Sequence, residues 1–130
     1  MKTLQLLESI HERLEFSDDR PLAKPLLVEQ TGRVLRFTLK PNQRVAEHCA
    51  PHSPVHIVVL RGKGMFAGED GAEVLLSSDD LVVFAAGEIH AIRALEEELV
   101  FVAFLHKVEG VPEPKHRATP KEDSYITWFM

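Results

Sequence analysis

The strongest constraint on the fold of this chain is a repeated pattern between about residue 26 and residue 105. Short apolar and β-branched segments alternate there with Gly, Pro, Asn or acidic residues. This pattern is typical of short antiparallel strands joined by tight turns, and no helix-length segment interrupts it. Because so many strands must cover their edges, the pattern predicts an all-β sandwich or closed jelly-roll barrel. The predicted strands are 26–28, 33–39, 55–60, 64–67, 73–76, 81–85, 89–95 and 99–105.

The first 20 residues have a different periodicity. Apolar positions recur there three and four residues apart, as on one face of an amphipathic helix, along Leu4, Leu7, His11 and Leu14. We therefore expect an N-terminal helix within residues 1–20 that packs on a barrel formed by residues 25–106.

The last 24 residues, 107–130, change character again. They begin with prolines among charges, which predicts an extended connection, and they end in the apolar stretch Tyr125–Met130. Exposing that stretch would cost about 25 cal/mol per Å² of apolar surface, so we expect it to dock. The sequence does not decide whether this stretch docks on its own barrel or on a second copy of the chain. A homodimer is the expected assembly.

Composition and charge narrow the possible partners. A chain of 130 residues is long enough for one core, and its net charge of −5 disfavours binding to nucleic acid. The only cysteine is Cys49, so no internal disulfide can form, and a reducing cytoplasm is expected. No apolar run approaches the roughly 20 residues that a membrane-spanning helix needs. The expected partner is a small molecule.

Four of the seven histidines lie where predicted strands meet turns. Three of them, His48, His52 and His56, recur at every fourth residue, so on one unbroken strand they would share a face. Pro51 and Pro54 interrupt that strand, so strand parity cannot decide which of these imidazoles lie near the fourth, His90.

These residues resemble the cupin superfamily over about residues 33–105, as a small conserved-barrel cupin with an eroded first metal motif. In that family His-x-His followed by a glutamate, and later Pro-x-Gly-x-x-His, supply three histidines and a glutamate to one metal ion. The second motif is matched from Asp80 to His90, with Ala85 in place of the proline. In the first motif only His48 remains, because Ala50 and Val55 stand where the second histidine and the glutamate are expected. The resemblance implies a double-stranded β-helix fold.

The resemblance leaves His48 and His90 as direct counterparts of metal ligands. We expect His52 to complete a three-histidine site, with His56 as a fourth candidate. A site made of imidazoles without a carboxylate suits a divalent transition metal. The sequence does not decide whether this metal is Zn, Ni, Cu, Fe or Mn. Glu47 and Glu88 are not expected to be ligands. A barrel that has lost its metal, with histidines merely solvated near turns, is the alternative.

Three functions remain open on this basis. The first is a metal-dependent enzyme acting on a small organic molecule in a pocket shaped by Phe37, Val59, Phe84 and Phe104. The second is a module that binds a small molecule or metal without catalysis, because the cupin fold hosts both. The third is a dimerisation unit whose interface includes Tyr125–Met130. No catalytic residue is evident, since the motif glutamate is replaced.

Overall fold

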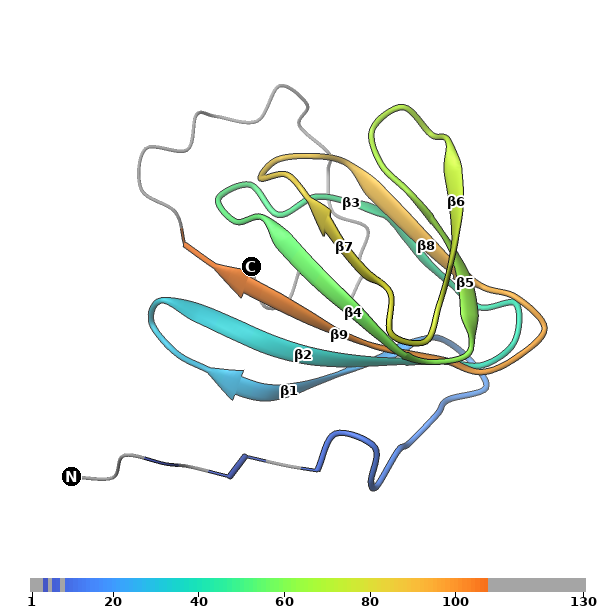
Figure 1. The fold of residues 1–130 in the computed structure, drawn as a ribbon, viewed down its shortest axis with the longest axis horizontal. Coiled ribbons are helices and arrows are strands. Elements are labelled where there is room, and N and C mark those ends of the chain that lie inside the picture. The colour runs from blue at the N-terminus through green and yellow to red at the C-terminus, as the bar shows by residue number, and fades with distance from the viewer. Residues whose placement is uncertain (1–3, 5, 8, 108–130) are drawn as a thin grey trace.

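The computed structural model describes residues 4, 6, 7 and 9–107 of the chain. Within these residues the chain forms nine strands and no helix (Figure 1). The strands are β1 (Leu22–Val28), β2 (Gly32–Leu39), β3 (Arg44–His48), β4 (Val55–Arg61), β5 (Lys63–Ala67), β6 (Glu73–Ser77), β7 (Leu81–Phe84), β8 (His90–Ala94) and β9 (Leu99–His106).

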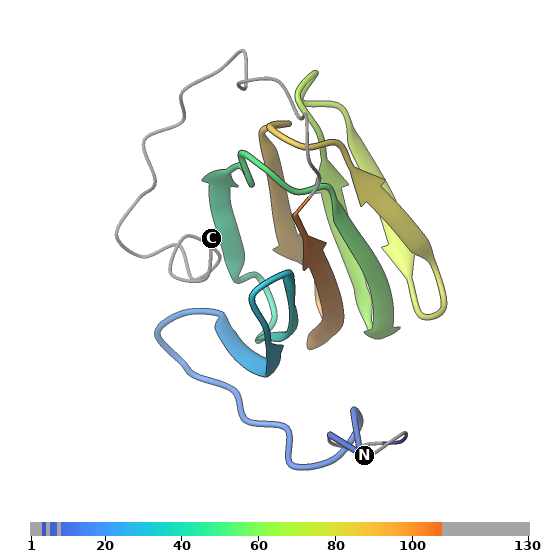
Figure 2. The same ribbon diagram turned by 90° about the vertical axis from the view of Figure 1, so that its left-hand side faces the viewer.

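The strands form two antiparallel sheets that face each other. Sheet A has the order β1-β2-β9-β4-β7, and sheet B has the order β3-β8-β5-β6. The turned view in Figure 2 shows the two layers side by side. Because consecutive strands repeatedly cross from one sheet to the other, segments that are far apart in the sequence become neighbours. The fold is the predicted double-stranded β-helix.

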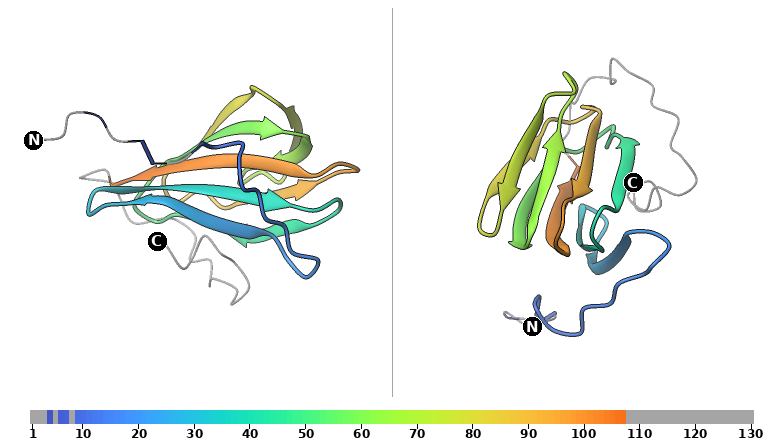
Figure 3. Two further views of the ribbon diagram at one scale, coloured as in Figure 1. Left: turned by 90° about the horizontal axis from the view of Figure 1, so that it is seen from below. Right: turned by 90° about the vertical axis from the view of Figure 1, so that its right-hand side faces the viewer.

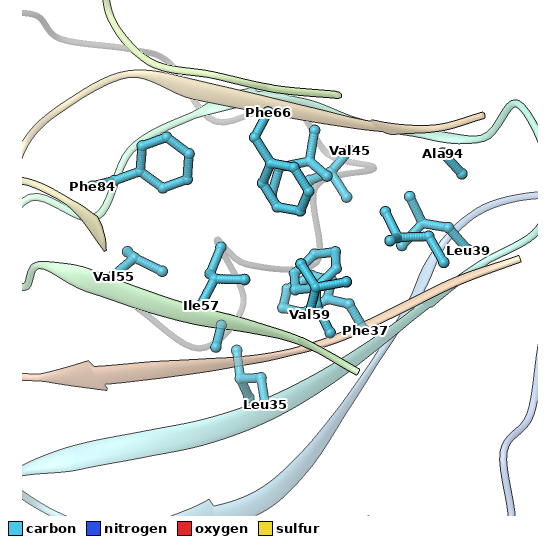
Figure 4. Packing of buried hydrophobic residues seen from close by; sticks show 14 of the residues in the cluster. Leu35, Phe37, Leu39, Val45, Val55, Ile57, Val59, Phe66, Phe84 and Ala94 are labelled. Carbon is cyan, nitrogen blue, oxygen red and sulfur yellow. The ribbon is translucent and has the colours of Figure 1, made fainter. Parts of the chain in front are cut away.

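Strand alternation builds the core between the sheets. Along β4, Val55, Ile57 and Val59 are fully buried, whereas the residues between them face outward and are half-buried. Phe37 and Phe101 stack at the centre with their ring centroids 4.8 Å apart. Figure 4 shows the core as one continuous layer, with Phe84 and Val55 at one end and Leu39 and Ala94 at the other.

Two differences from the predicted strands matter for the site. The sequence pattern missed β3, which ends at His48, because its residues Arg44–His48 are charged or polar at three of five positions. Sheet A also begins earlier than expected, since β1 starts at Leu22, and Pro25 sits at an irregularity of this edge strand. The other predicted strands are confirmed within one or two residues.

The predicted N-terminal helix is wrong for the residues that the structure describes. Residues 9–16 form a turn and an extended segment that crosses the outer face of sheet A over β2 (Figure 3). The guanidinium of Arg36 donates to the carbonyl oxygens of Ile10 and Glu12 at 3.1 and 3.3 Å, and the Thr38 hydroxyl donates to that of Glu15 at 2.6 Å. A helix would use these carbonyls internally, so the buried donors on β2 compete with helix formation.

The consequence is an exposed apolar N-terminus. Leu4 and Leu7 are 83% and 43% exposed, and His11 is exposed as well, so the apolar stripe is not packed on sheet A as an amphipathic helix would be. No described segment combines the helical length and the apolar character needed to cross a membrane. The predicted docking segment Tyr125–Met130 lies outside the described residues.

Candidate functional site

The two stretches that carry the expected metal ligands meet in sheet B. β3 pairs with β8, with Val45 opposite Ile92 and, after a one-residue bulge, His48 opposite His90. Without the bulge, the residue opposite His90 would be Glu47. The irregularity therefore sets the register that brings the backbones of His48 and His90 together.

His90 faces the core and is 1% exposed. Its Nδ1 lies 3.0 Å from the carbonyl oxygen of Glu88, so Nδ1 carries the proton and donates to that oxygen. Its ring stacks on Phe84, with centroids 4.3 Å apart and planes 8° from parallel. The His90 ring is therefore buried, with Phe84 on one of its faces.

The other two predicted ligands lie elsewhere. His52 is exposed in the turn between β3 and β4. His56 belongs to the outward-facing residues of β4 and stacks on His106 of β9, with centroids 5.6 Å apart. Because the side chains of adjacent strand residues alternate, the inward neighbour of His56 is Val55, which occupies the expected glutamate position and is fully buried.

The carboxylate of Glu88 has a structural role. It accepts hydrogen bonds from the backbone amides of Ala85 at 2.9 Å and Glu69 at 3.3 Å, and so ties the β7–β8 turn to the β5–β6 turn. A Cβ on Gly68 would come within 2.5 Å of a Glu88 carboxylate oxygen, so a larger residue there would displace this flexible side chain. Glu47 is exposed. Glu88 meets His90 through its backbone carbonyl oxygen, while its carboxylate is bound by the two turn amides.

A groove opens between the sheets where the edge strands β6 and β7 face each other. Its volume is about 610 Å³, within the range of small-molecule pockets. The inner faces of three strands supply its apolar wall, namely Phe66, Val74, Leu76, Val82 and Phe84. Val74 is 57% exposed although it lies on the inner face of β6, because no facing strand covers it.

Acidic groups line one rim of this groove. Glu69, Asp70 and Glu88 come from the β5–β6 and β7–β8 turns, and the charged lining residues are all acidic. The carboxylate of Asp70 accepts a hydrogen bond from the Ala72 amide at 3.0 Å, which holds the turn in place. An apolar wall with a negative rim favours a neutral or cationic molecule over an anion.

The sequence predicted one of the residues that line this groove and missed the others. Phe84 lines it as predicted, whereas Phe37 and Val59 are fully buried in the core. Phe104 was wrongly assigned to the pocket: it faces outward from β9 and is 41% exposed. The apolar residues of β6 were missed, and their only sequence signal was an unbroken apolar run, Val74–Leu76, in a short strand.

The described side chains do not fit a three- or four-ligand metal centre around His90. No group of three His, Cys, Asp or Glu side chains capable of holding one ion occurs among those the structure describes. The positions that would supply two further ligands hold Ala50 and Val55, both buried in the core. The imidazole of His90 packs against Phe84, which forms part of the groove wall.

Two facing antiparallel sheets with this strand order define a protein of the double-stranded β-helix class. The family model of the cupin domain matches residues 35–105, and the chain belongs to this family. None of the curated proteins matches the chain significantly.

Solved structures agree with this fold. An uncharacterized conserved protein with a double-stranded β-helix domain from Klebsiella pneumoniae superposes with a TM-score of 0.74 at 20% identity, over 84% of this chain and 95% of that one. An RmlC-like cupin protein from Desulfovibrio desulfuricans gives a TM-score of 0.65 at 26% identity, over 81% and 96%. A cupin superfamily protein from Desulfitobacterium hafniense gives 0.69 at 16% identity, over 83% and 94%.

Proposed function

We propose that this cupin binds a small, mainly apolar organic molecule in the groove between β6 and β7, as a binding module without catalysis. The observation that carries the proposal is the apolar wall formed by Phe66, Val74, Leu76, Val82 and Phe84 at a gap between two edge strands. Val74 is 57% exposed in this wall and Leu76 and Val82 are half-buried, so a ligand would gain from covering the apolar surface that they leave open.

The rim defines the class of ligand. Glu69 and Asp70 are exposed at one end of the groove, and a carboxylate or phosphate on the ligand would approach them at a cost. The ligand we propose therefore has an apolar body and a neutral or cationic polar end. Phe66 and Phe84, which are 2% and 5% exposed, form the floor of the groove rather than its open wall.

A fluorescence titration with the neutral apolar probe N-phenyl-1-naphthylamine tests this proposal. Leu76 and Leu75 are neighbours on β6, but Leu76 lines the groove and Leu75 is on the opposite face. Leu76→Trp fills the groove and should weaken saturable probe binding about tenfold or more, whereas Leu75→Trp should leave it unchanged. The anionic analogue 8-anilinonaphthalene-1-sulfonate should bind more weakly than the neutral probe.

Two results would count against the groove as the binding site. One is the lack of saturable binding to the unmodified chain. The other is an equal loss of probe binding in the two tryptophan variants, provided that both variants keep the thermal unfolding transition of the unmodified chain.

A second candidate function is binding of a divalent transition metal by His48 and His90, with or without turnover of a small molecule. The pairing of these two residues across the β3–β8 ladder favours it. It ranks second because transition-metal centres usually need three or four protein ligands. Metal content, measured by mass spectrometry on untagged protein, should be stoichiometric in the unmodified chain and lost in His90→Ala. Equal substoichiometric content in both would remove this candidate.

A further inference from the structure

The outer face of sheet A carries a pair of histidines that the groove does not use. His56 on β4 and His106 on β9 lie diagonally across adjacent strands, since His56 is directly opposite Phe104 in the ladder. Their ring centroids are 5.6 Å apart and their planes are inclined by 24°. His106 is exposed and His56 is half-buried, so water can reach this pair.

The spacing of the two rings matches that of two imidazoles on one metal ion. Nitrogens bound at about 2.0–2.1 Å to one tetrahedral zinc ion place the two ring centroids about 5 Å apart. The observed 5.6 Å is close to that spacing, and rotation about the side-chain torsions would turn one nitrogen of each stacked ring toward a common ion.

The backbone holds both histidines in place. The His106 amide donates to the Ser53 hydroxyl at 2.7 Å, and that hydroxyl donates to the Pro54 carbonyl at 2.6 Å. Ser53 therefore fastens the end of β9 to the loop that leads into β4. On its other side, His106 is opposite Gly32 of β2, where a Cβ would come within 2.5 Å of the Leu105 carbonyl oxygen, so glycine permits the close pairing of β2 with β9.

We propose that His56 and His106 form a two-imidazole site for one divalent transition-metal ion, with water in the remaining coordination positions. Imidazole ligands select Cu²⁺, Ni²⁺ or Zn²⁺ over Mg²⁺ or Ca²⁺, and Cu²⁺ should bind most tightly. With two protein ligands and water completing the coordination sphere, the site should bind its ion more weakly than a centre with three or four protein ligands. The site is separate from the ladder pair His48 and His90, which lies in sheet B.

Isothermal titration calorimetry with Cu²⁺ and Zn²⁺ on the full chain tests the site. One ion per chain should bind, and His56→Gln or His106→Gln should each weaken binding about tenfold or more, with no further loss in the double variant. Because His52 and His116 are the nearest alternatives in the sequence, His52→Gln and His116→Gln serve as controls and should bind as the unmodified chain does.

A second measurement reports the location directly. Substoichiometric Cu²⁺ should selectively broaden the amide resonances of His56, Phe104 and His106 in a heteronuclear NMR spectrum, and His90→Ala should leave that pattern unchanged. Binding that survives His56→Gln, broadening centred on His90 or His116, or the lack of a saturable site would each overturn the proposal.

Discussion

At the scale of single residues, Arg36 shows how a buried side chain can override the local conformational preference of a distant segment. It is 2% exposed on the outer face of sheet A, and its guanidinium reaches the carbonyls of Ile10, Glu12 and Arg13. A buried guanidinium needs acceptors, and an extended segment offers the carbonyls that a helix would keep for itself. Together with Thr38, whose hydroxyl donates to the carbonyl of Glu15, this arginine holds the N-terminal segment in its extended conformation.

Replacing this arginine should release the segment. In Arg36→Met the donors are lost while the stem is kept, and we expect a loss of about 1.5–3 kcal/mol in the free energy of unfolding, as for a hydrogen bond to a charged group. Limited trypsin digestion should also cut after Arg13 several times faster. Arg33→Met, on the same strand, is the control. Similar cleavage rates in the two variants would show that Arg36 does not hold the segment.

Ion pairs on the protein surface contribute less to folding stability than the buried hydrogen bonds of Arg36. Arg93 on β8 donates to Glu73 on β6 at 2.7 Å across the outer face of sheet B, and this hydrogen bond lowers the pKa of Glu73 below its ordinary value. The pair contributes stability at neutral pH, and that contribution is lost as the pH falls through the lowered pKa of Glu73. Because both groups are exposed to solvent, its effect on folding is small.

At the scale of elements, the β4–β5 turn shows how a close approach fixes the connection between the sheets. Gly62 has a φ of +82°, and a Cβ on it would collide with the carbonyl oxygen of Glu98 in the β8–β9 turn. β4 belongs to sheet A and β5 to sheet B, so this turn joins the two layers. Only glycine satisfies both the backbone conformation and the contact.

The variants Gly62→Ala and Gly71→Ala separate these two requirements. Gly71 also has a positive φ, of +75°, but a Cβ there meets nothing within 4 Å. Both variants incur the conformational cost of about 1–3 kcal/mol, and only Gly62→Ala adds the clash. Urea denaturation should therefore show a clearly larger loss of stability for Gly62→Ala. Equal urea midpoints for the two variants would mean that the β8–β9 turn moves away from the added Cβ without loss of stability.

At the scale of the whole molecule, apolar surface remains uncovered on the outer face of sheet A. Leu81, Val83 and Phe104 are 70%, 54% and 41% exposed. The sequence predicts that the apolar end Tyr125–Met130 docks on the barrel or on a second copy, and these residues lie outside those that the structure describes. A homodimer therefore stays a prediction.

A chain that ends before Ser124 tests the role of this apolar end. If Tyr125–Met130 forms part of an interface between copies, the shortened chain should elute later in gel filtration, as a smaller species, and sedimentation velocity should give the same result. Removing the segment should leave the far-ultraviolet circular dichroism of the barrel unchanged. An unaltered association state would remove the segment from any interface.

The sequence by itself determined the all-β fold, most strand positions, the turns and the second cupin motif. It could do so because alternation and turn chemistry are local: the period-two pattern of Val55, Ile57 and Val59 is visible without knowing what they face. The sequence also predicted that the stretches at His48 and His90 meet, through resemblance to a family rather than through spacing.

Only the tertiary structure decided which side chains meet across elements. The bulge in β3 sets the position of His48 against His90, and the diagonal pairing of β4 with β9 places His56 beside His106. The β6–β7 groove exists because the edges of two sheets face each other. These features depend on register and on packing between distant segments, and a one-residue shift in register changes which side chains are neighbours without changing the local pattern.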